Sequence, residues 1–421
     1  MHVVRVVRRL FGRSVLIRSY TATVAALLVV TGSSAFSFVS GHPGSRAAGA
    51  VTWTKISSNT KEAIASAGLY RTSDGRLHVV WSSQDSGPSY SLHYSTLGAH
   101  AKLITAGTIL SNWASVTTYP RLVPGPNAGI RLVFTGADGK SGSPYNNSDM
   151  YSATASSGGA TWALTPGSMS QSKLVPLTDD AAVTEPNGTP VAAWSTGGGA
   201  TLAFHVGVDP TAPATAPDHS VSAGAGGVVV GPTLARDTSG HIWAAWFDGS
   251  FKSDQGYYVD QIVPAKGRTK APGSGGNLAS NQPLEAVAFA ERVGGGLYLA
   301  YCVPTKTVPC AHIALWRVGS ATARAVPGSA TGHASHVAIA AGPGGHLSVG
   351  WYDSQANKIK FVTTNSAATG FGTVRTISAP PSTAEFDGLQ LEGSKGALDV
   401  VALTFQLKGS VTAYWATEVT P

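Results

Sequence analysis

Charged side chains are scarce in this chain, because Asp, Glu, Lys and Arg together make up 12% of its 421 residues. So few charges leave little polar surface for long helices that face solvent, and a mainly helical fold is not favoured. The chain instead contains 50 Gly and 24 Pro, which interrupt short apolar runs. This combination predicts an all-β fold that is rich in turns.

Acidic residues are absent from the first 50 positions, which contain six arginines: Arg5, Arg8, Arg9, Arg13, Arg18 and Arg46. The rest of the chain has 23 basic and 22 acidic side chains, so the net charge of +7 belongs almost entirely to the N-terminal segment. A nearly neutral body lacks the positive patch that binds nucleic acid, and we expect no nucleic-acid partner.

The N-terminal segment has the order of a secretory signal peptide. The basic stretch "MHVVRVVRRLFGRSVLIRSY" precedes the apolar "TATVAALLVVTG", and small residues follow. We therefore predict a signal peptide with a short linker over residues 1–49, and a secreted protein. The strongest apolar stretch, residues 24–30, is short for a membrane span of ~20 residues. The alternative is an uncleaved N-terminal segment that tethers the protein to a membrane.

Cysteine is also rare, with only Cys302 and Cys310, which flank "VPTKTVP". In an exported protein, two nearby cysteines indicate a disulfide, and free buried thiols are the alternative. No matching pattern of histidines accompanies them. His333 and His336 lie three residues apart, which on a strand points their rings to opposite faces. We therefore predict no metal site and no cofactor.

Three common catalytic signatures are missing. The sequence contains no Gly-x-Ser-x-Gly elbow, no complete phosphate-binding loop ending in Gly-Lys-Ser/Thr and no His-Glu-x-x-His. These absences argue against the hydrolase, nucleotide-binding and zinc-protease classes that depend on them.

A glycine turn followed by an alternating strand recurs seven times. In "GGHLSVGWYDS", Leu347, Val349 and Trp351 alternate with small or polar residues, which is typical of a half-buried strand. Similar segments lie 49 to 59 residues apart, and their turn glycines are Gly75, Gly129, Gly188, Gly240, Gly296, Gly345 and Gly396.

Each copy has an apolar strand before the glycine turn and two strands after the alternating one. Four antiparallel strands in about 50 residues, repeated radially, make a β-propeller blade. We predict a seven-bladed all-β propeller over residues 50–421, with blades that start near 57, 115, 174, 228, 281, 332 and 382. The last repeat lacks a fourth strand, and Ala50–Ile56 is predicted to close the ring in its place. Separate β-sandwich domains are the alternative fold.

The repeat also predicts which residues share a face. If each inner strand runs toward its glycine turn, the starts of the inner strands and the loops between second and third strands meet on the opposite face. The candidate ligand-binding residues there are Tyr119, Arg121, Asp138, Tyr145, Asn146, Asp248, His336, Asp353 and Asp387. Tyr, Asn and Asp side chains suit sugar hydroxyls. A structural role in turns, or for His336 at the surface or in the core, is the alternative.

The segment "ATASSGGATW", Ala153–Trp162, resembles the Asp-box hairpin of sialidase-type (BNR repeat) β-propellers, Ser-x-Asp-x-Gly-x-Thr-Trp. Gly159, Thr161 and Trp162 match, whereas residues 155 and 157 are Ala and Ser instead of Ser and Asp. The resemblance implies a sialidase-like propeller in which this hairpin is structural and lies away from the catalytic face.

The resemblance also implies what a sialidase would need: three arginines for the substrate carboxylate, a Tyr activated by a Glu, and an Asp acid/base. Only Arg121 stands at the start of an inner strand, since Arg71, Arg236 and Arg292 precede turn glycines on the other face. Sialic-acid specificity is therefore not favoured. Other glycosidases need only two carboxylates, and the candidate catalytic residues are Asp180, Glu285 and Glu385.

These observations predict a secreted monomer that recognises an extracellular ligand, with a carbohydrate as the preferred class. The alternatives are an exo-acting glycoside hydrolase and a scaffold for protein–protein interaction. No membrane contact is expected beyond the N-terminal segment.

Overall fold

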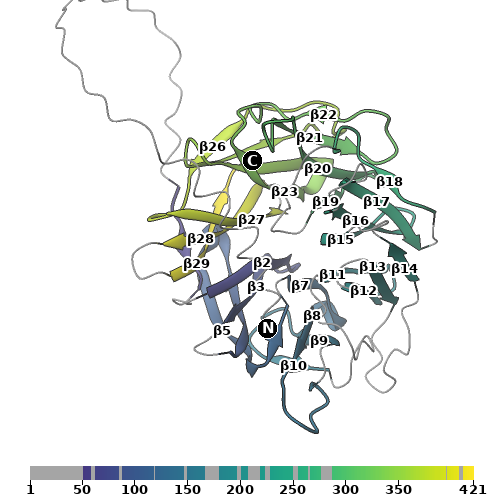
Figure 1. Cartoon of the computed structure of the whole chain (residues 1–421). Helices are drawn as coiled ribbons and strands as arrows, with labels where there is room; N and C mark the ends of the chain where they lie inside the picture. Colours follow the sequence, from purple (N-terminus) through teal and green to yellow (C-terminus); the bar gives the residue numbers. More distant parts are fainter. Residues whose placement is uncertain are drawn as a thin grey trace, which may run out of the picture. The chain divides into compact units, whose positions relative to one another are not determined.

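The computed structural model describes residues 51–57, 62–84, 88–117, 119–146, 149–165, 180–196, 201–206, 219–222, 228–249, 255–263, 266–275, 287–394, 396–406 and 411–421. The predicted signal peptide and Glu285 lie outside these residues. Within them the chain forms seven antiparallel sheets around a common axis (Figure 1). The predicted seven-bladed β-propeller is therefore confirmed.

The first three blades lie between residues 62 and 222. Blade 1 contains β2 (Glu62–Arg71), β3 (Leu77–Gln84), β4 (Tyr90–Leu97) and β5 (Leu103–Trp113). Blade 2 contains β6 (Ser115–Val116), β7 (Arg121–Pro124), β8 (Ile130–Ala137), β9 (Asp149–Ala155) and β10 (Trp162–Leu164). Blade 3 contains β11 (Asp180–Thr184), β12 (Pro190–Thr196), β13 (Thr201–Val206) and β14 (His219–Ser222).

The other four blades complete the ring. Blade 4 contains β15 (Val229–Arg236), β16 (Ile242–Asp248), β17 (Gly256–Val263) and β18 (Thr269–Lys270). Blade 5 contains β19 (Ala288–Glu291), β20 (Leu297–Val303), β21 (His312–Arg317) and β22 (Arg324–Ala325). Blade 6 contains β23 (Ala334–Ala341), β24 (Leu347–Asp353), β25 (Lys358–Thr363) and β26 (Arg375–Ser378). Blade 7 contains β27 (Glu385–Ser394), β28 (Ala397–Gln406), β29 (Val411–Val419) and β1 (Thr54–Lys55).

Helical structure is limited, in the described residues, to single 3-10 turns. They are η1 (Ala99–Ala101), η2 (Pro126–Ala128) and η4 (Pro343–Gly345). None of the helices in this part of the chain is long and apolar enough to cross a membrane.

The second strand of each blade is buried on both faces, whereas its alternating pattern predicted a half-buried strand. All seven residues of β24 are buried. Leu347, Val349 and Trp351 belong to the cluster shared with blade 5. On the other face, a Cβ added to Gly350 would lie 2.9 Å from Leu391 of blade 7. Blades thus cover both faces of the strand, so its polar positions must be small.

Six of the seven predicted turn glycines adopt the left-handed backbone. Their φ angles lie between 78° and 94°, which favours glycine because a Cβ would be strained there. Gly129 is the exception at −83°, because the preceding residues Asn127 and Ala128 take the positive φ values in that turn. A Cβ on Gly129 would instead lie 2.4 Å from the carbonyl oxygen of Ala155.

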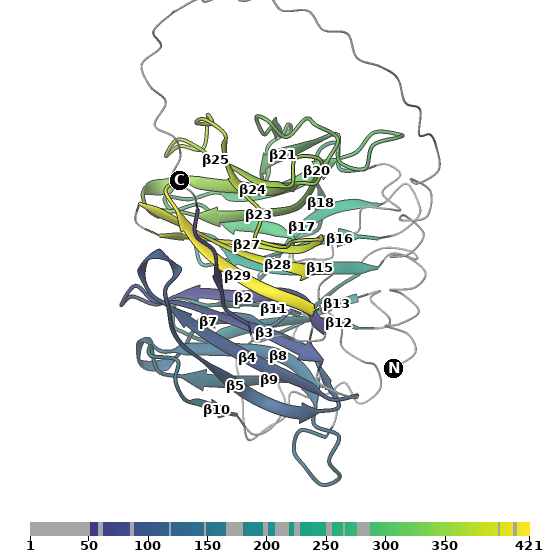
Figure 2. The same cartoon turned by 90° about the vertical axis from the view of Figure 1, so that its left-hand side faces the viewer.

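The N-terminal strand closes the ring as predicted. β1 pairs antiparallel with β29 through Thr54 with Ala416 and Lys55 with Trp415. Figure 2 shows this strand, at the purple end of the colour scale, beside the yellow β29. The amide of Ile56 continues the pairing by donating to the carbonyl of Tyr414 at 3.0 Å. Blade 7 therefore combines the first strand of the propeller with the last three. In it, β1 covers the outer edge of β29.

Candidate functional site

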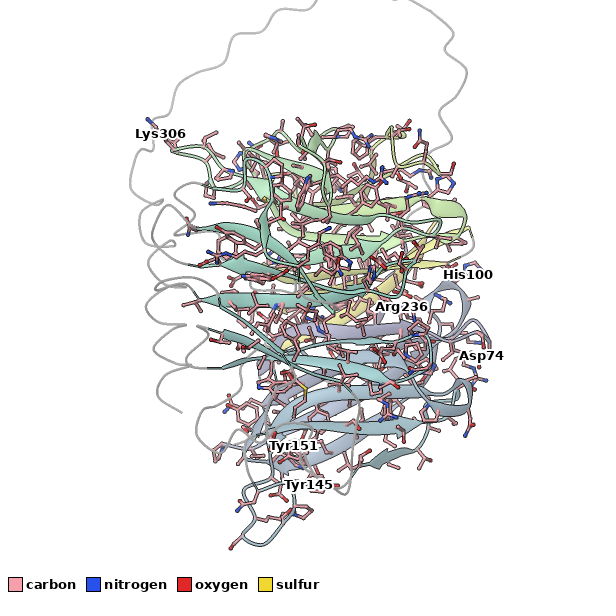
Figure 3. All side chains as sticks on the ribbon, turned by 90° about the vertical axis from the view of Figure 1, so that its right-hand side faces the viewer. Asp74, His100, Tyr145, Tyr151, Arg236 and Lys306 are labelled. Atoms are coloured by element: carbon pink, nitrogen blue, oxygen red, sulfur yellow. A yellow bond between two sulfur atoms is a disulfide. The ribbon has the colours of Figure 1, made fainter. Side chains whose placement is uncertain are left out.

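The loops divide between two faces of the ring, as the strand directions require. Figure 3 shows Asp74, His100 and Arg236 on one side of the ring, and Tyr145 and Lys306 on the opposite side. We call the side of the glycine turns the turn face. The other side, where inner strands begin and second strands end, is the loop face.

The inner strands are irregular near the loop face. Their register with the second strand shifts between Ile64 and Gly68 in β2, and between Val230 and Thr233 in β15. Shifts also occur between Ser335 and Ala338 in β23, and between Phe386 and Gly388 in β27. Bulges of this kind bend a strand and free backbone groups from the ladder.

A cavity of about 330 Å³ lies on the axis between the inner strands. Its polar wall comes from Ser66, Arg121, Thr233, Gln390 and Glu392. Small residues such as Gly68, Ala182 and Ala338 complete the wall and leave room on the axis. We call this space the axial cavity. Its volume lies within the range of roughly 300–1,000 Å³ that small-molecule sites occupy.

Arg121 joins three blades at the axial cavity. Its Nε donates to the carbonyl of Asp180 at 3.0 Å, and Nη2 donates to the carbonyl of Pro232 at 3.1 Å. The Pro232 carbonyl lies in the β15 bulge, which frees it from the ladder. The guanidinium also stands 5.9 Å from the ring centroid of Tyr119, which is itself buried. The sequence placed Arg121 at the start of an inner strand, and β7 does begin there.

Asp180 fills a break in the inner strand of blade 2. That strand is divided into β6 and β7, and in the gap between them the amide of Thr117 donates to the carbonyl of Thr135 at 2.8 Å. The amide of Thr135 in β8 donates to Oδ2 of Asp180 at 2.9 Å instead. Burial raises the pKa of this fully enclosed carboxyl to about 6, against the lowering effect of the Thr117 and Thr135 hydrogen bonds and of Arg121.

The axial cavity also contains an amide and a carboxyl that the sequence did not single out. Gln390 Nε2 donates to the Ser66 hydroxyl at 2.9 Å, and Gln390 Oε1 has no hydrogen-bond partner among the described residues. Two residues further along β27, Glu392 also lines the cavity. Their spacing of two on an inner strand is the signal that could have indicated a shared direction toward the axis.

Glu392 belongs to a charged cluster at the turn-face end of the axis. Its cross-strand partner is Asp399, whose carboxylate is bonded by the guanidinium of Arg71. Arg71 also donates from its backbone amide to Glu392. Burial, followed by the charge of Asp399, raises the pKa of Glu392 to about 7. Burial likewise raises the pKa of Asp399. We call Arg71, Glu392 and Asp399 the seam cluster, because it joins blades 1 and 7.

The long loop of blade 2 uses its polar groups internally. Asp138 Oδ1 accepts from the amide of Lys140 at 2.9 Å, and Oδ2 accepts from the hydroxyl of Ser143. Tyr145 packs on Trp113 and Tyr151, with ring centroids 5.5 and 5.3 Å away. Asn146 is exposed. Asp138 and Tyr145 therefore hold the loop together, and Asn146 projects into solvent.

The two aspartates that end second strands are also buried. Asp353 accepts from the amide of Ala356 at 3.1 Å and from Lys360 Nζ at 2.7 Å. Burial alone would raise the pKa of Asp353, but the bond and charge of Lys360, together with the backbone amides of Ala356 and Gln355, lower that pKa on balance. Asp248, at the matching position of β16, is completely buried. Both side chains thus belong to the blade interior more than to the surface.

The remaining predicted residues lie where blades 6 and 7 meet on the loop face. His336 has a positive φ of 51° in the β23 bulge, which brings its ring 5.4 Å from that of Phe386. Phe386 stacks in turn on Tyr352 at 4.2 Å. Glu385, exposed, and Asp387, half-buried, flank this stack on β27. Glu285 lies outside the described residues.

The predicted Cys302–Cys310 disulfide is present, with its Cα atoms 4.9 Å apart. It closes the loop between β20 and β21 on the loop face. The described residues contain no group of three His, Cys, Asp or Glu side chains arranged to hold a metal ion.

The segment that resembles an Asp-box forms a hairpin between β9 and β10. Gly159 has a φ of 66°, and a Cβ there would lie 2.8 Å from the buried His78 of blade 1. Tyr94 of blade 1 donates to the carbonyl of Ala160 at 3.1 Å. The hairpin therefore packs against the neighbouring blade.

Comparisons with known proteins give no match among protein-family models or curated sequences. Among solved structures, a protein of unknown function from Dyadobacter fermentans is 10% identical with a TM-score of 0.50, and the alignment covers 88% of this chain and 98% of that one. An α-L-arabinanase of Penicillium chrysogenum complexed with arabinobiose is 13% identical, with a TM-score of 0.45 and coverage of 88% and 98%. A Hadza microbial sialidase is 9% identical, with a TM-score of 0.47 and coverage of 85% and 66%. The Dyadobacter protein shares the fold of this chain.

Proposed function

We propose that this chain is an exported β-propeller that binds a carbohydrate in the axial cavity. The observation that carries the proposal is the wall of that cavity, where hydroxyl, amide, guanidinium and carboxyl groups from four blades converge. Sugar hydroxyls both donate and accept, so they suit a wall that offers both kinds of group. The side-chain amide of Gln390, which donates to the Ser66 hydroxyl at 2.9 Å, is one of these groups.

Export is supported by the disulfide. Disulfides persist in oxidising compartments outside the cytosol, and Cys302 and Cys310 are paired in this structure. The basic and apolar leader of the sequence agrees with that compartment.

The proposal is tested on the full chain by a glycan array followed by calorimetric titration of the best-bound glycan. Gln390→Leu keeps the volume of the side chain but removes its amide, so we expect the affinity to fall on the order of tenfold, the effect of one lost hydrogen bond. Gln406→Leu makes the same change outside the cavity and should bind like the wild type. Binding that Gln390→Leu leaves unchanged, or an array without any bound glycan, contradicts the proposal.

An exo-acting glycoside hydrolase is the second candidate, and Glu392 favours it. A carboxyl whose pKa is raised to about 7 keeps its proton in about half of the molecules at neutral pH, and a general acid must carry a proton; Glu392 also lines the axial cavity. This candidate predicts that the wild type releases sugar from the bound glycan and that Glu392→Gln does not. Release that persists in Glu392→Gln but stops in Glu285→Gln would move the acid to the residue chosen from the sequence.

The scaffold alternative has no comparable support. The large apolar side chains that are exposed in the described residues are Leu103 and Ile104 on β5, Val228 before β15, and Val293 after β19. They belong to three different blades, whereas a protein-binding patch is contiguous.

A further inference from the structure

We propose that the turn-face end of the boundary between blades 5 and 6 binds an acidic polysaccharide, a linear chain of sugars that carry carboxylates. Three arginines of blade 5 form this site: Arg292 directly after β19, Arg317 at the end of β21 and Arg324 at the start of β22. We call them the arginine row. None of them lines the axial cavity, so this site and the site of the proposed function can exist independently.

The side chains of the arginine row lie on the face of blade 5 that packs on blade 6. Arg317 pairs with Tyr298 across the strands, and Arg324 pairs with Leu315. Tyr298 and Leu315 belong to the hydrophobic cluster that blades 5 and 6 share. Because cross-strand partners point to the same face of a sheet, Arg317 and Arg324 also face blade 6.

Two of the guanidinium groups bond the same connection of blade 6, between β25 and β26. Nη1 of Arg292 donates to the carbonyl of Ser366 at 2.6 Å, and Nη2 of Arg324 donates to the carbonyl of Ala368. Residues two apart in a chain are separated by at most roughly 7 Å. The two guanidinium groups are therefore near neighbours. Main-chain carbonyls hold them in position but do not balance their charges.

Acids are scarce around the arginine row. In the part of the chain that the structure describes, none of the ion pairs includes a member of the row. Residues 287–378, which form blades 5 and 6 and are all described, contain seven Lys and Arg but only two acids, Glu291 and Asp353. Asp353 bonds Lys360 on the loop face. The nearly neutral net charge of the whole propeller conceals this local excess of positive charge.

Other blades balance an arginine at the same turn position. Arg71, Arg236 and Arg292 each precede a turn glycine by four residues. Arg71 bonds the carboxylate of Asp399. Burial raises the pKa of Glu291, and the charge of Arg236 opposes that rise. Glu291 therefore accompanies the arginine of blade 4, on the opposite face of its strand from the next residue, Arg292. Of the three arginines, only Arg292 has main-chain carbonyls as its sole partners.

The spacing of the arginine row favours an extended ligand. Its members stand at the turn-face ends of the first, third and fourth strands of blade 5. Neighbouring strands are ~4.8 Å apart, so the row extends over roughly 14 Å, more than a single small anion covers. A chain with one carboxylate on each sugar carries its charges at comparable intervals. Each guanidinium can bond such a carboxylate through two parallel N–H groups.

A flat anionic surface such as a membrane fits the turn face less well. The turns of blades 1, 3 and 4 place the acids Asp74, Glu185 and Asp237 at the same side of the ring, where each is exposed or half-buried. A membrane would meet these acids together with the arginine row. A single polysaccharide chain can instead follow the boundary between two blades.

The test is calorimetric titration of the full chain with polygalacturonate at low salt, with dextran as the uncharged polysaccharide. We expect polygalacturonate to bind. Arg317→Gln should lower its affinity about threefold, and Arg317→Gln combined with Arg324→Gln about tenfold, as for exposed charges. The Arg317 guanidinium bonds none of the described residues, so Arg317→Gln should melt like the wild type. Dextran binding, where it occurs, should be the same in all these proteins.

Arg76→Gln is the matched control. It removes one positive charge from the same face, but at blade 1, where Asp74 lies 3.5 Å from the arginine. Its affinity for polygalacturonate should stay within about twofold of the wild type. A loss as large as that of Arg317→Gln would mean that only the net charge matters, which overturns the site.

Gln390→Leu separates this proposal from the proposed function, and it should bind polygalacturonate like the wild type. Binding that is lost in Gln390→Leu but kept in the double arginine variant would assign polygalacturonate to the axial cavity and overturn the site on blade 5. Absence of polygalacturonate binding also overturns it. Tighter binding of duplex DNA or of phosphatidylglycerol vesicles, abolished by the double arginine variant, overturns the class of partner.

Discussion

The two ends of the propeller axis each carry a half-buried arginine next to a buried acid, but the arginines are used differently. Near the loop face, Arg121 bonds two main-chain carbonyls and leaves the Asp180 carboxylate to the Thr135 amide. Near the turn face, Arg71 bonds the Asp399 carboxylate directly, and Glu392 lies across the strand pair from Asp399. There, the single positive charge of Arg71 interacts with both Asp399 and Glu392.

The difference explains how the acids titrate. Desolvation raises the pKa of Asp180 to about 6 and that of Glu392 to about 7. For Glu392 the neighbouring Asp399 adds repulsion to the cost of burial, whereas Arg121 lowers the pKa of Asp180. Arg121 thus connects strands of three blades through main-chain carbonyls. Arg71 instead balances the negative charge of Asp399 where blades 1 and 7 meet.

The largest expected effect is that of removing each arginine. Arg71→Met leaves the buried Asp399 without its cation, which should cost about 3–5 kcal/mol of unfolding free energy at pH 8. Arg121→Met leaves two carbonyls without a donor, which should cost about 1–3 kcal/mol at any pH. Chemical denaturation at pH 8 and pH 5 measures both. The free-energy cost of Arg71→Met should be smaller at pH 5, where more of the Asp399 and Glu392 carboxyls are protonated. Equal costs at both pH values would contradict the difference in use between Arg71 and Arg121.

A smaller effect is expected from neutralising Glu392. Its folded pKa is raised, so the folded state binds more protons, and the contribution to stability is complete below the unfolded pKa of about 4.5 and lost as pH rises through about 7. Because this side chain is half-buried at the axial cavity, we expect Glu392→Gln to be about 2 kcal/mol more stable than the wild type at pH 8. The two proteins should differ little at pH 4.

Melting curves between pH 4 and 8 measure this difference. Gln355→Glu, which adds an acid at an exposed position, is the control and should leave the pH profile of the wild type unchanged. A Glu392→Gln profile parallel to that of the wild type would show that Glu392 carries no raised pKa.

The smallest change in stability, over the narrowest range of pH, is expected for Asp180 near the loop face. The stability that the protonated Asp180 contributes is complete below about pH 3.9 and lost as pH rises through about 6. Asp180→Asn keeps an oxygen for the Thr135 amide and should flatten this part of the profile by about 1–2 kcal/mol. Melting curves between pH 4 and 8 measure this change. A flattening centred above pH 7 would show that an acid other than Asp180 causes the loss of stability between about pH 4 and 6.

The sequence could predict what repeats and what is local. Seven glycine turns followed by alternating strands predicted the number of blades, and the missing fourth strand of the last repeat predicted the pairing of β1 with β29. The order of the strands predicted which residues share a face, and Arg71 and Arg236 do lie on the turn side of their strands. These properties follow from patterns within about ten residues, where side-chain direction is fixed by the strand itself.

The tertiary structure alone decided how the polar groups are used. Asp180 is a partner for a broken strand, because β6 and β7 separate beside Thr135. Asp138 and Asp353 bond their own loops, and Glu392 joins Arg71 and Asp399 at the seam. Each of these roles depends on bulges, breaks and contacts between blades. Arg71 and Asp399 are 328 positions apart in the chain and meet only because the ring closes. A pattern that is read one strand at a time carries no information about such a contact.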